Sequence, residues 1–350
     1  MNFGFWGKLK KPILALAPMA NVTDAAFRRI IAKYGKPDVM YTEFVSADGL
    51  CHSDAREKLL IDLKFSDAER PIVAQLFTSR PENMRRTSAL VSELGFDGID
   101  INMGCPDRSV EKQGSGAALI KNPARARELI RAAKEGAPNL PVSVKTRIGY
   151  NKNELSTWLP ELLAEELAAV IIHARTRKEM SKVPARWECV REAALIRDSL
   201  HSSTLILGNG DVADIDDARR KCEETGADGV MLGRAIFGNP FLFSKQKRPL
   251  LVEGRMPLDS AWGEMYASSI SEKLEVMVEH TKLFEELLGA HKNFSIMKKH
   301  YKAYVHGFDS AKELRMKLME AGNAADVERI VKTGVVELNN VIQMGGGDSN

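Results

Sequence analysis

Short, mostly apolar runs alternate with helical stretches along the first two thirds of the chain. Runs of this kind are typical of parallel strands buried on both faces, and the patterns between them have the period of amphipathic helices. The predicted strands span residues 13–17, 38–43, 72–77, 97–101, 141–145, 169–173, 204–207 and 228–232. The predicted helices between them span residues 23–34, 81–94, 123–134, 153–168, 187–200 and 211–225.

Strands that alternate with helices form parallel sheets joined by right-handed crossovers. Eight strands in about 230 residues is the number and size of a (β/α)8 TIM barrel. A doubly wound open sheet is the alternative. Its dinucleotide-binding version needs Gly-x-Gly-x-x-Gly after the first strand, and residues 18–24 do not contain it. We therefore predict the barrel.

The alternation ends near residue 240, and helical patterns alone continue from about residue 258. They predict helices at residues 262–288, 292–306, 310–321 and 324–341. We therefore expect a barrel domain over residues 1–245 and a smaller all-α domain over residues 246–344. The last residues, 345–350, are rich in glycine and are expected to form a disordered tail.

Composition supports an ordinary globular protein and narrows its setting. The 350 residues are 44% hydrophobic and 28% charged, with a net charge of +3, which excludes a fibrous or wholly disordered chain. No apolar run approaches the roughly 18 residues of a membrane span, and the short apolar stretch after Lys8 to Lys11 carries two prolines, which favours a strand over a signal peptide. The four cysteines form no Cys-x-x-Cys pair. We expect a cytoplasmic protein with no bound metal.

In a TIM barrel the active site forms at the carboxyl ends of the strands. Polar or otherwise distinctive residues follow nearly every predicted strand, although any one of them could serve only as a cap or a solvated loop residue. These residues are Pro18, Met19, Ala20, Glu43, Gln75, Asn102, Lys145, Arg147, His173, Arg175, Asn209, Gly210, Asp211, Gly233 and Arg234.

The loops after the last two predicted strands indicate a phosphate site. Asn209, Gly210 and Asp211 follow one of these strands, and Gly233 and Arg234 follow the other. Loops at these positions bind phosphate in many TIM barrels, because glycines let backbone N–H groups approach phosphate oxygens. The alternative is that the glycines are turn residues only. Since no phosphate-transfer motif accompanies the loops, they favour a phosphorylated cofactor, and flavin mononucleotide (FMN) fits.

Other strand-end residues suit a flavin ring. A reduced flavin needs a positive charge near its N1–C2 edge, and Lys145 can supply it. Gln75 can hydrogen-bond the ring edge, and the backbone of residues 18–20 can border the ring. His173 can contact the phosphate or the substrate, although a single histidine at a strand end is as often structural.

Cys105 stands between Gly104 and Pro106, just after the fourth predicted strand. A buried structural thiol is one interpretation. In a loop at the catalytic face, the thiol can instead act as a general acid or a nucleophile. Residues 109–118 include Gly114 and Gly116, and we expect this segment to be a mobile lid.

Seven segments together resemble the tRNA-dihydrouridine synthase family, in its order and spacing, across residues 12–243. They are L-A-L-A-P-M-A-N-V-T-D at 14–24, I-N-M-G-C-P at 101–106, G-S-G-A-A at 114–118, S-V-K-T-R-I-G at 143–149, H-A-R-T-R at 173–177, L-G-N-G-D at 207–211 and V-M-L-G-R-A at 230–235. One departure is Ala174, where the family usually has glycine. It adds a methyl group that we expect near the phosphate side of the cofactor.

The resemblance implies an FMN-dependent reduction of the C5–C6 double bond of uridines in tRNA, with NADPH as the reductant. It implies hydride transfer from flavin N5 to C6 and proton transfer from Cys105 to C5. Asn102 and Arg147 would hold the uracil edge, and Arg175 is included among the substrate contacts. The flavin contacts that the resemblance implies are Pro18, Met19, Ala20, Gln75, Lys145, His173, Asn209, Gly210, Asp211, Gly233 and Arg234.

A tRNA substrate also requires a basic surface, and its target base must leave the stack at a cost of a few kcal/mol. The predicted helix at 291–306 carries Lys292, Lys298, Lys299 and Lys302, no acidic residue, and three aromatic side chains. Basic charge combined with aromatic rings is typical of RNA contacts. A solvated helix face with core aromatics is the alternative. We predict that Lys298, Lys299 and Lys302 contact tRNA and that the protein is a monomer.

Two other functions compete with this interpretation. A small-molecule FMN oxidoreductase of the dihydroorotate dehydrogenase type shares the barrel and the flavin, but it has no use for a basic helical appendage. A non-catalytic RNA-binding protein would not need Cys105, Lys145 and His173 together. The motifs select neither a subfamily nor the uridine that is reduced.

Overall fold

The computed structural model describes residues 2–244, 261–308 and 310–345. Its eight predicted strands are all present and form one parallel sheet. The strands are β1 (Ile13–Leu16), β2 (Met40–Ser46), β3 (Ile72–Phe77), β4 (Gly98–Met103), β5 (Val142–Arg147), β6 (Ala169–His173), β7 (Leu205–Asn209) and β8 (Gly229–Leu232).

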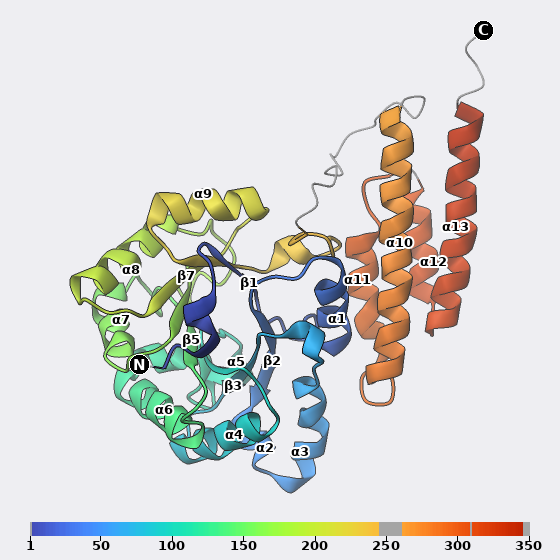
Figure 1. Ribbon diagram of the computed structural model, residues 1–350. Helices are drawn as coiled ribbons and strands as arrows, with labels where there is room; N and C mark the ends of the chain where they lie inside the picture. Colours follow the sequence, from blue (N-terminus) through green and yellow to red (C-terminus); the bar gives the residue numbers. More distant parts are fainter. Residues whose placement is uncertain (1, 245–260, 309, 346–350) are drawn as a thin grey trace. The chain divides into compact units, whose positions relative to one another are not determined.

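The sheet closes on itself into a barrel. Neighbouring strands follow the order β1-β8-β7-β6-β5-β4-β3-β2, and the two ends of this series meet just before β2. There Ala15 pairs with Val39 in a parallel bridge, and the Leu16 N–H donates to the Val39 carbonyl at 3.0 Å. Figure 1 shows the strands at the centre with helices around them. The predicted TIM barrel is confirmed.

Helices occupy the predicted gaps between strands. They are α1 (Ala25–Tyr34), α4 (Pro81–Glu93), α6 (Pro123–Gly136), α7 (Leu155–Leu163), α8 (Trp187–Ser199) and α9 (Ile215–Thr225). Local chemistry sets several of their ends. The Asn122 and Asp214 side chains accept from backbone N–H groups at the starts of α6 and α9, as N-cap residues do. Gly226 ends α9 with φ +71°, the left-handed conformation that glycine adopts without strain.

The sequence prediction missed or overextended some helices. Between β2 and β3 the chain forms α2 (Ala47–Leu50) and α3 (Ser53–Leu60), which were not predicted. No residue of α3 is buried, so it carries no apolar stripe that a pattern search detects. The helix predicted at residues 153–168 ends at Leu163, and Glu166 then takes φ +48° in the turn that leads to β6.

The barrel interior is filled by apolar side chains that several strands contribute. Ala15, Tyr41, Val73, Ile171 and Met231 belong to one buried cluster. The short 3-10 helix Gly4–Lys8 adds Trp6, which is 2% exposed, near the first residues of the strands. The amino end of the barrel is therefore packed, and the candidate site is expected at the carboxyl ends of the strands.

Contacts divide the chain into two compact units. The first contains residues 1–24 and 37–235, and the second contains Ala25–Lys36 together with the chain from Ile236 onward. Helix α1, which the sequence pattern assigns to the barrel, therefore packs with the C-terminal helices. Phe27 of α1 lies against the rings of His280 and His300, and Lys33 donates to Glu279 at 2.7 Å. The domain boundary predicted at residue 245 borders a segment outside the described residues and stays a prediction.

The second unit also contains α10 (Ala261–Leu288), α11 (Met297–Tyr304), α12 (Ala311–Glu320) and α13 (Ala324–Gly345). The helix predicted at 292–306 is shorter in the structure, because the Asn293 side chain caps a 3-10 turn, Phe294–Ile296, before α11 begins. Helix α13 includes Gly345, the first residue of the predicted tail, and the rest of that tail lies outside the described residues. No helix among the described residues is long and apolar enough to cross a membrane.

Candidate active site

The predicted strand-end side chains lie on adjacent strands at one end of the barrel. In the register of the sheet, Asn102 pairs with Lys145, Arg147 with His173, and His173 with Asn209. Gln75 on β3 is fully buried next to β4. The structure therefore brings together residues that lie up to about a third of the chain apart, at the face where TIM barrels bind their substrates.

Lys145 is half-buried among polar groups at this face. Its Nζ lies 3.1 Å from Asn209 Oδ1, and the Asn209 amide donates to the Met231 carbonyl at 2.8 Å. Burial, with a smaller contribution from the nearby Arg147 charge, lowers the pKa of Lys145 to about 8. The ammonium group is therefore charged at neutral pH, but at a cost that a bound anion would offset.

His173 lies in a positive field. Burial lowers the pKa of His173 well below its ordinary value, and the charges of Lys145, Arg147, Arg175 and Arg234 lower it further. The ring is therefore neutral at pH 7. Several cations acting on one half-buried group mark a place where an anion is stabilised.

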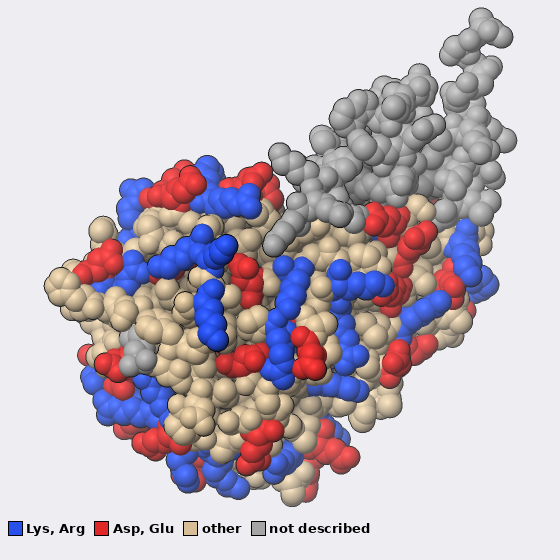
Figure 2. Space-filling view, viewed as in Figure 1, with Lys and Arg blue, Asp and Glu red and all other residues tan. Residues whose placement is uncertain are grey.

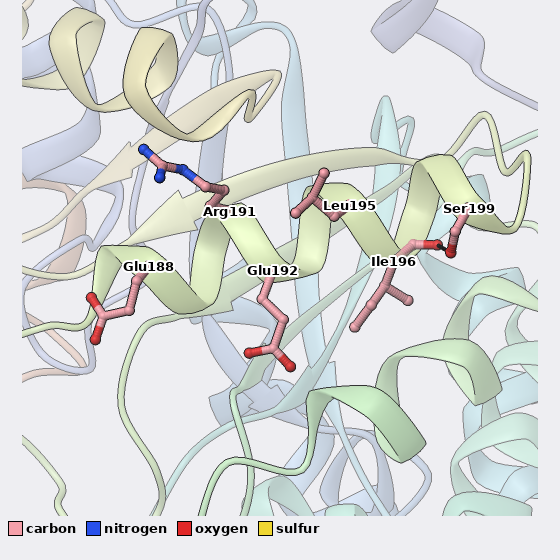
Figure 3. Close-up of a pocket in the computed structure, with 6 residues that line it drawn as sticks. All are labelled: Glu188, Arg191, Glu192, Leu195, Ile196 and Ser199. Atoms are coloured by element: carbon pink, nitrogen blue, oxygen red, sulfur yellow. Dashed lines mark hydrogen bonds between the residues drawn. The ribbon is translucent and has the colours of Figure 1, made fainter.

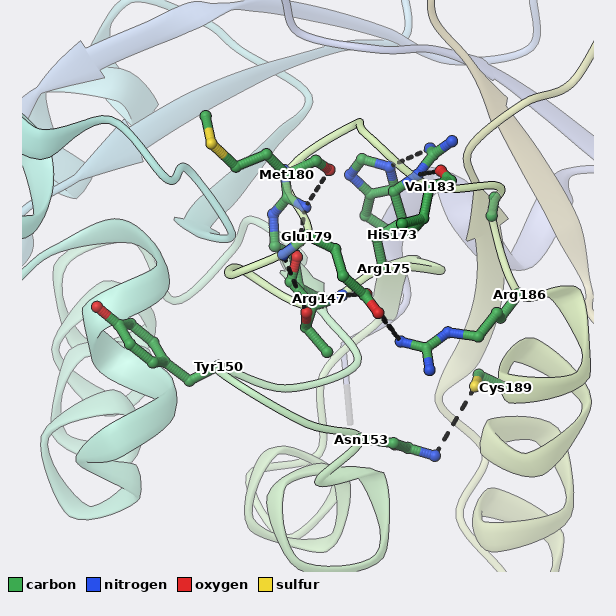
Figure 4. Close-up of polar contacts among 12 residues, drawn as sticks. Arg147, Tyr150, Asn153, His173, Arg175, Glu179, Met180, Val183, Arg186 and Cys189 are labelled. Carbon is green, nitrogen blue, oxygen red and sulfur yellow. Dashed lines mark hydrogen bonds and ion pairs between the residues drawn. The ribbon is translucent and has the colours of Figure 1, made fainter.

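The loop after β6 holds Arg175 in a fixed position (Figure 4). Arg175 Nε donates to the Val183 carbonyl at 2.6 Å, and Nη1 lies 3.1 Å from His173 Nε2. Arg175 Nη2 donates to Asp211 Oδ2, and Asp211 Oδ1 accepts from Arg234 Nη2 at 2.5 Å. Arg175 thus ties His173 to the β7 loop, and its predicted contact with the substrate stays a prediction.

The loops after β7, β8 and β1 border one another. Gly210 has φ +119°, and a Cβ atom there would lie 2.9 Å from Ala185 and 3.1 Å from the His173 ring, so only glycine fits. A Cβ atom on Gly233 would lie 3.7 Å from the Met19 sulfur. Residues 18–20, held by a bond from the Met19 N–H to Thr23 Oγ1 at 2.9 Å, therefore adjoin the predicted phosphate loops.

The backbone around Cys105 is held from three directions. Asn102 Oδ1 accepts from the N–H groups of Gly104 and Cys105 at 3.1 and 2.9 Å. Arg147 Nε donates to the Gly104 carbonyl at 2.7 Å, and the Ala117 N–H donates to the Cys105 carbonyl at 3.0 Å. Burial raises the pKa of the Cys105 thiol. The thiol is therefore protonated at neutral pH, as a general acid must be.

The predicted lid contains a short helix, α5 (Arg108–Glu111), and is anchored to other loops. Both oxygens of Glu111 accept from Arg177, which follows β6, and Arg177 lies over the Tyr150 ring at 5.4 Å. Ser79 donates to the Gln113 carbonyl at 2.5 Å. In this structure the segment is therefore an ordered cover next to Cys105.

Sequence reasoning missed two contributors to this face. Asp100 on β4 is completely buried and accepts from Gln75 and Ser143. The signal was an acidic residue inside an apolar run, where charge is expensive unless it is hydrogen-bonded. Glu111 was the other, and no local pattern indicated its pairing with Arg177, 66 residues away.

The Ala174 side chain is fully buried and packs with Val190, Ala227, Ala185 and Trp187. The extra methyl group is therefore accommodated in an apolar cluster beside α8. Trp187 of this cluster donates to the Gly210 carbonyl of the predicted phosphate loop, and the expected place of Ala174 near the phosphate stays a prediction.

The predicted tRNA contacts lie on α11, in the second unit. Lys302 is exposed, and Lys298 and Lys299 are half-buried. Tyr301 and Tyr304 are 0% and 1% exposed, and the Thr281 hydroxyl lies 3.3 Å from the Tyr301 hydroxyl. These tyrosines are core residues, as the alternative interpretation expected, so they do not stack on RNA bases, whereas Phe294 is half-buried. On the face of the molecule that Figure 2 shows, basic and acidic side chains are interspersed, as a net charge of +3 suggests.

A separate surface pocket lies on α8 and carries none of this chemistry. Figure 3 shows that a single helix supplies all of its lining side chains, which are Glu188, Arg191, Glu192, Leu195, Ile196 and Ser199. Because none of them is at the carboxyl end of a strand, we do not consider this pocket an active site. Within residues 2–244, 261–308 and 310–345, no three His, Cys, Asp or Glu side chains are placed to hold a metal ion.

Comparison with known proteins decides the family. The family model described as dihydrouridine synthase (Dus) matches residues 15–339. The chain belongs to the dihydrouridine synthase family. The match covers both the barrel and the C-terminal helices, which favours this family over a dihydroorotate dehydrogenase.

Two relatives match nearly end to end. The probable tRNA-dihydrouridine synthase 2 of Bacillus subtilis (strain 168) is 39% identical over 333 residues, covering 95% of this chain and 96% of its own. A probable tRNA-dihydrouridine synthase of Staphylococcus epidermidis is 38% identical over 335 residues, covering 95% and 97%. This dihydrouridine synthase family member therefore shares its whole architecture with them.

Similarity to solved structures supports the fold alone. The 6-hydroxypseudooxynicotine amine oxidase of Pseudomonas geniculata N1 superposes with a TM-score of 0.50 at 12% identity, covering 81% of this chain and 53% of its own.

Proposed function

We propose that this protein is a tRNA-dihydrouridine synthase that binds FMN, takes electrons from NADPH and reduces the C5–C6 double bond of uridines in tRNA. The observation that carries the proposal is the Cys105 loop, whose backbone Asn102 and Arg147 hold at the same barrel face as Lys145 and His173. The family match and the names of the two relatives support it.

The residues present suit FMN. The cations that act on His173 favour a phosphate, and Gly210 leaves no side chain between the backbone and such a group. Lys145 suits the electron-rich edge of the ring, while Gln75 and residues 18–20 would border it. When bound, the flavin would supply the hydride that reaches C6 of the uracil.

The protein's own contribution is to hold the base and deliver a proton. Cys105 Sγ carries the proton for C5, since burial keeps the thiol protonated. Asn102 uses one amide hydrogen on Gln75 and retains a second for the uracil edge. The Arg147 guanidinium, at the end of β5, is buried and donates to the Gly104 carbonyl of the Cys105 loop, where it can orient the base and exclude water.

The tRNA must present an unstacked uridine, which requires contacts away from the barrel as well. We propose that Lys298, Lys299 and Lys302 on α11 provide phosphate contacts, because cations without base specificity are suited to positioning a nucleic acid backbone. Arg175 and Asp211 act in this proposal by holding the β6 and β7 loops together.

A cellular experiment tests the function directly. Dihydrouridine is mapped in tRNA from a strain that lacks this protein, from the same strain with the protein restored, and with Cys105→Ala restored. We expect specific dihydrouridines to disappear, to return with the native protein, and to stay absent with the variant. A tRNA population unchanged by the deletion would overturn the proposal.

The half-reactions of the purified protein test the role of Cys105. We predict that Cys105→Ala is reduced by NADPH at the normal rate, because that step does not need the thiol. Oxidation by tRNA should slow by about 10²-fold or more, the range for a positioned acid. Cys51→Ala is the matched control, since Cys51 is also a free, half-buried thiol but lies near Thr87, away from the site. Normal oxidation of Cys105→Ala by tRNA would show that another group is the acid.

A further inference from the structure

A continuous chain of hydrogen bonds connects the inside of the barrel to the Cys105 loop. It begins at Asp100, passes through Gln75 and Asn102, and ends at the backbone N–H groups of Gly104 and Cys105. Asp100, Gln75 and Asn102 are 0%, 0% and 6% exposed. Burial excludes competing water, so each bond in the chain constrains the next.

Asp100 is an acceptor at the start of this chain. Ser143 Oγ donates to one of its oxygens at 2.6 Å, and Gln75 Nε2 donates to the other at 2.7 Å. Burial raises the pKa of Asp100 to about 6, and Lys145, the cation that faces it, opposes the shift. Tyr41 is the other titratable group that interacts with it. At pH 8 the carboxylate is ionised and can only accept.

This acceptor determines the orientation of two amides in turn. Because Gln75 must aim its NH2 group at Asp100, its carbonyl faces Asn102, which donates to it at 3.0 Å. Asn102 therefore aims its own carbonyl away from Gln75 and toward the N–H groups of Gly104 and Cys105. If the Asn102 amide were reversed, its N–H groups would face two other donors.

We propose that Asp100 is a positioning residue that, through Gln75 and Asn102, holds the Cys105 loop in its reactive conformation. The inference rests on the proposed role of Cys105 as the acid, and it adds the reason why the loop adopts one conformation. Without the acceptor at position 100, both amides can reverse, and the loop opens.

The proposal makes two opposite predictions for one thiol. An opened loop misplaces Cys105 relative to its substrate, so the tRNA-dependent step slows. The same opening exposes a thiol that is now mostly buried, so its reaction with a small alkylating reagent accelerates. General loosening of the barrel would also expose Cys51, and the two effects can be separated.

The experiment compares flavin-loaded Asp100→Ala, Asp100→Asn and wild type at pH 8. The asparagine variant restores an oxygen acceptor for Gln75 and aims its NH2 at Ser143, so it should rescue. Thr204→Val is the matched control, because Thr204 is equally buried and its hydroxyl also loses two bonds, one to the Leu167 carbonyl and one from Ser202, at the opposite end of the barrel. Iodoacetamide labelling of Cys105 and Cys51 is followed by mass spectrometry, and the NADPH and tRNA half-reactions by flavin absorbance.

For Asp100→Ala we expect labelling of Cys105 to rise about fivefold or more relative to Cys51, as local opening predicts. Oxidation by tRNA should slow by about tenfold to 10²-fold, the effect of a misplaced reacting group. Asp100→Asn should recover most of both changes. If Asp100→Ala does not fold, Gln75→Met interrupts the same chain of hydrogen bonds. That variant is then labelled in the presence of excess FMN, and the same rise in Cys105 labelling is expected.

Three results would overturn the proposal. Asp100→Ala could match Thr204→Val in every assay, it could expose Cys51 as much as Cys105, or Asp100→Asn could be as impaired as Asp100→Ala. The labelling assay does not depend on tRNA. A wild-type protein that leaves tRNA unmodified would therefore refute the proposed function, and the labelling ratio of Cys105 to Cys51 would still test the role of Asp100.

Discussion

The charge on Lys145 is balanced between two opposing effects. Burial and Arg147 disfavour the ammonium form, whereas Asp100 and Cys105 favour it. The outcome, a pKa of about 8, places the loss of charge within an experimentally accessible range. An anionic ligand would add a further favourable interaction with the charged form.

We therefore predict that the affinity of the protein for FMN falls above about pH 8, as the free protein loses the Lys145 proton. Because only the charged form attracts the flavin, the Kd should rise toward tenfold per pH unit in that range. Titration of flavin-free protein with FMN between pH 6.5 and 9.5 measures it. Lys145→Met should bind more weakly and lose this pH dependence.

Lys134→Met is the control for that titration. Burial also lowers the pKa of Lys134, but this lysine donates to the Glu165 carbonyl on the outside of the barrel. Its variant should keep the wild-type profile. If Lys145→Met keeps the profile too, a different group controls FMN binding.

At the scale of elements, the cover over the Cys105 loop depends on one ion pair. Glu111 at the end of α5 bonds to Arg177 with both oxygens, and both side chains are largely buried. A hydrogen bond to a charged group contributes about 1.5–3 kcal/mol. That is enough to decide whether a four-residue helix stays docked.

We predict that Glu111→Gln increases hydrogen exchange in residues 107–116 by about tenfold, because the amide cannot pair with Arg177 through two acceptors. Exchange measured by mass spectrometry on the flavin-loaded protein tests this. Glu161→Gln removes a carboxylate that pairs with Arg127 at 3.0 Å on the barrel exterior and should leave residues 107–116 unaffected. Unchanged exchange in Glu111→Gln would mean that the remaining contacts of the segment hold it alone.

Helix α11 has a different function in the proposal, because its buried face is structural and Lys298 and Lys302 contribute positive charge. Lys298 and Lys302 are four residues apart and share a face. We predict that replacing both with alanine weakens tRNA binding and reduces the log–log salt slope by about one unit per lost phosphate contact. Flavin reduction by NADPH should not change.

Lys8 and Lys10 serve as the matched pair for that measurement. Both are exposed and flank the segment that packs at the amino end of the barrel, away from the candidate site. Their double alanine variant should bind tRNA with the wild-type salt slope. Equal slopes for both double variants would show that the α11 lysines only solvate their helix.

At the scale of the whole molecule, the second unit contains two buried histidines. His280 and His300 are 0% and 1% exposed, and their ring centroids lie 4.8 Å apart. Neither nitrogen of His280 has a hydrogen-bond partner among the described residues. Burial lowers the pKa of His280 to about 3, and burial with His280 and Lys299 nearby lowers that of His300 well below normal.

These shifts predict an acid-sensitive helical unit. Between pH 6.5 and 3 the unfolded chain binds a proton at His280 and the folded unit does not, so stability falls as the pH falls. His280 contributes a slope of up to about 1.4 kcal/mol per pH unit in that range, and the lowered pKa of His300 acts in the same direction. Denaturant unfolding of wild type and His280→Leu between pH 7.5 and 4.5 measures it.

The leucine variant should have a shallower dependence of unfolding free energy on pH. His52→Gln, which changes an exposed histidine, should keep the wild-type slope. An equal slope in wild type and His280→Leu would show that His280 is protonated without cost in the folded unit.

The sequence predicted some levels of this structure better than others. All eight strands were located within a few residues, since their apolar runs are local. Helix α3 was missed because it buries no residue. Among the site residues, Lys145, His173 and Asn209 meet as expected, because the carboxyl ends of parallel strands share one edge. The full engagement of Arg175 and the burial of Tyr301 depend on neighbours that no local pattern specifies.

By itself, the sequence determined the alternation of strands and helices, the glycine positions of the phosphate-type loops and the set of reactive side chains. The period of apolar residues, the residues that favour turns and the spacing within motifs all involve positions that are close in the sequence, so the sequence alone can predict them. Only the tertiary structure decided how the barrel closes at Ala15 and Val39, that α1 packs with the C-terminal helices, and how the amides between Asp100 and Cys105 are oriented. Each of these depends on contacts between residues some 24 or more positions apart, which form only when the chain has folded.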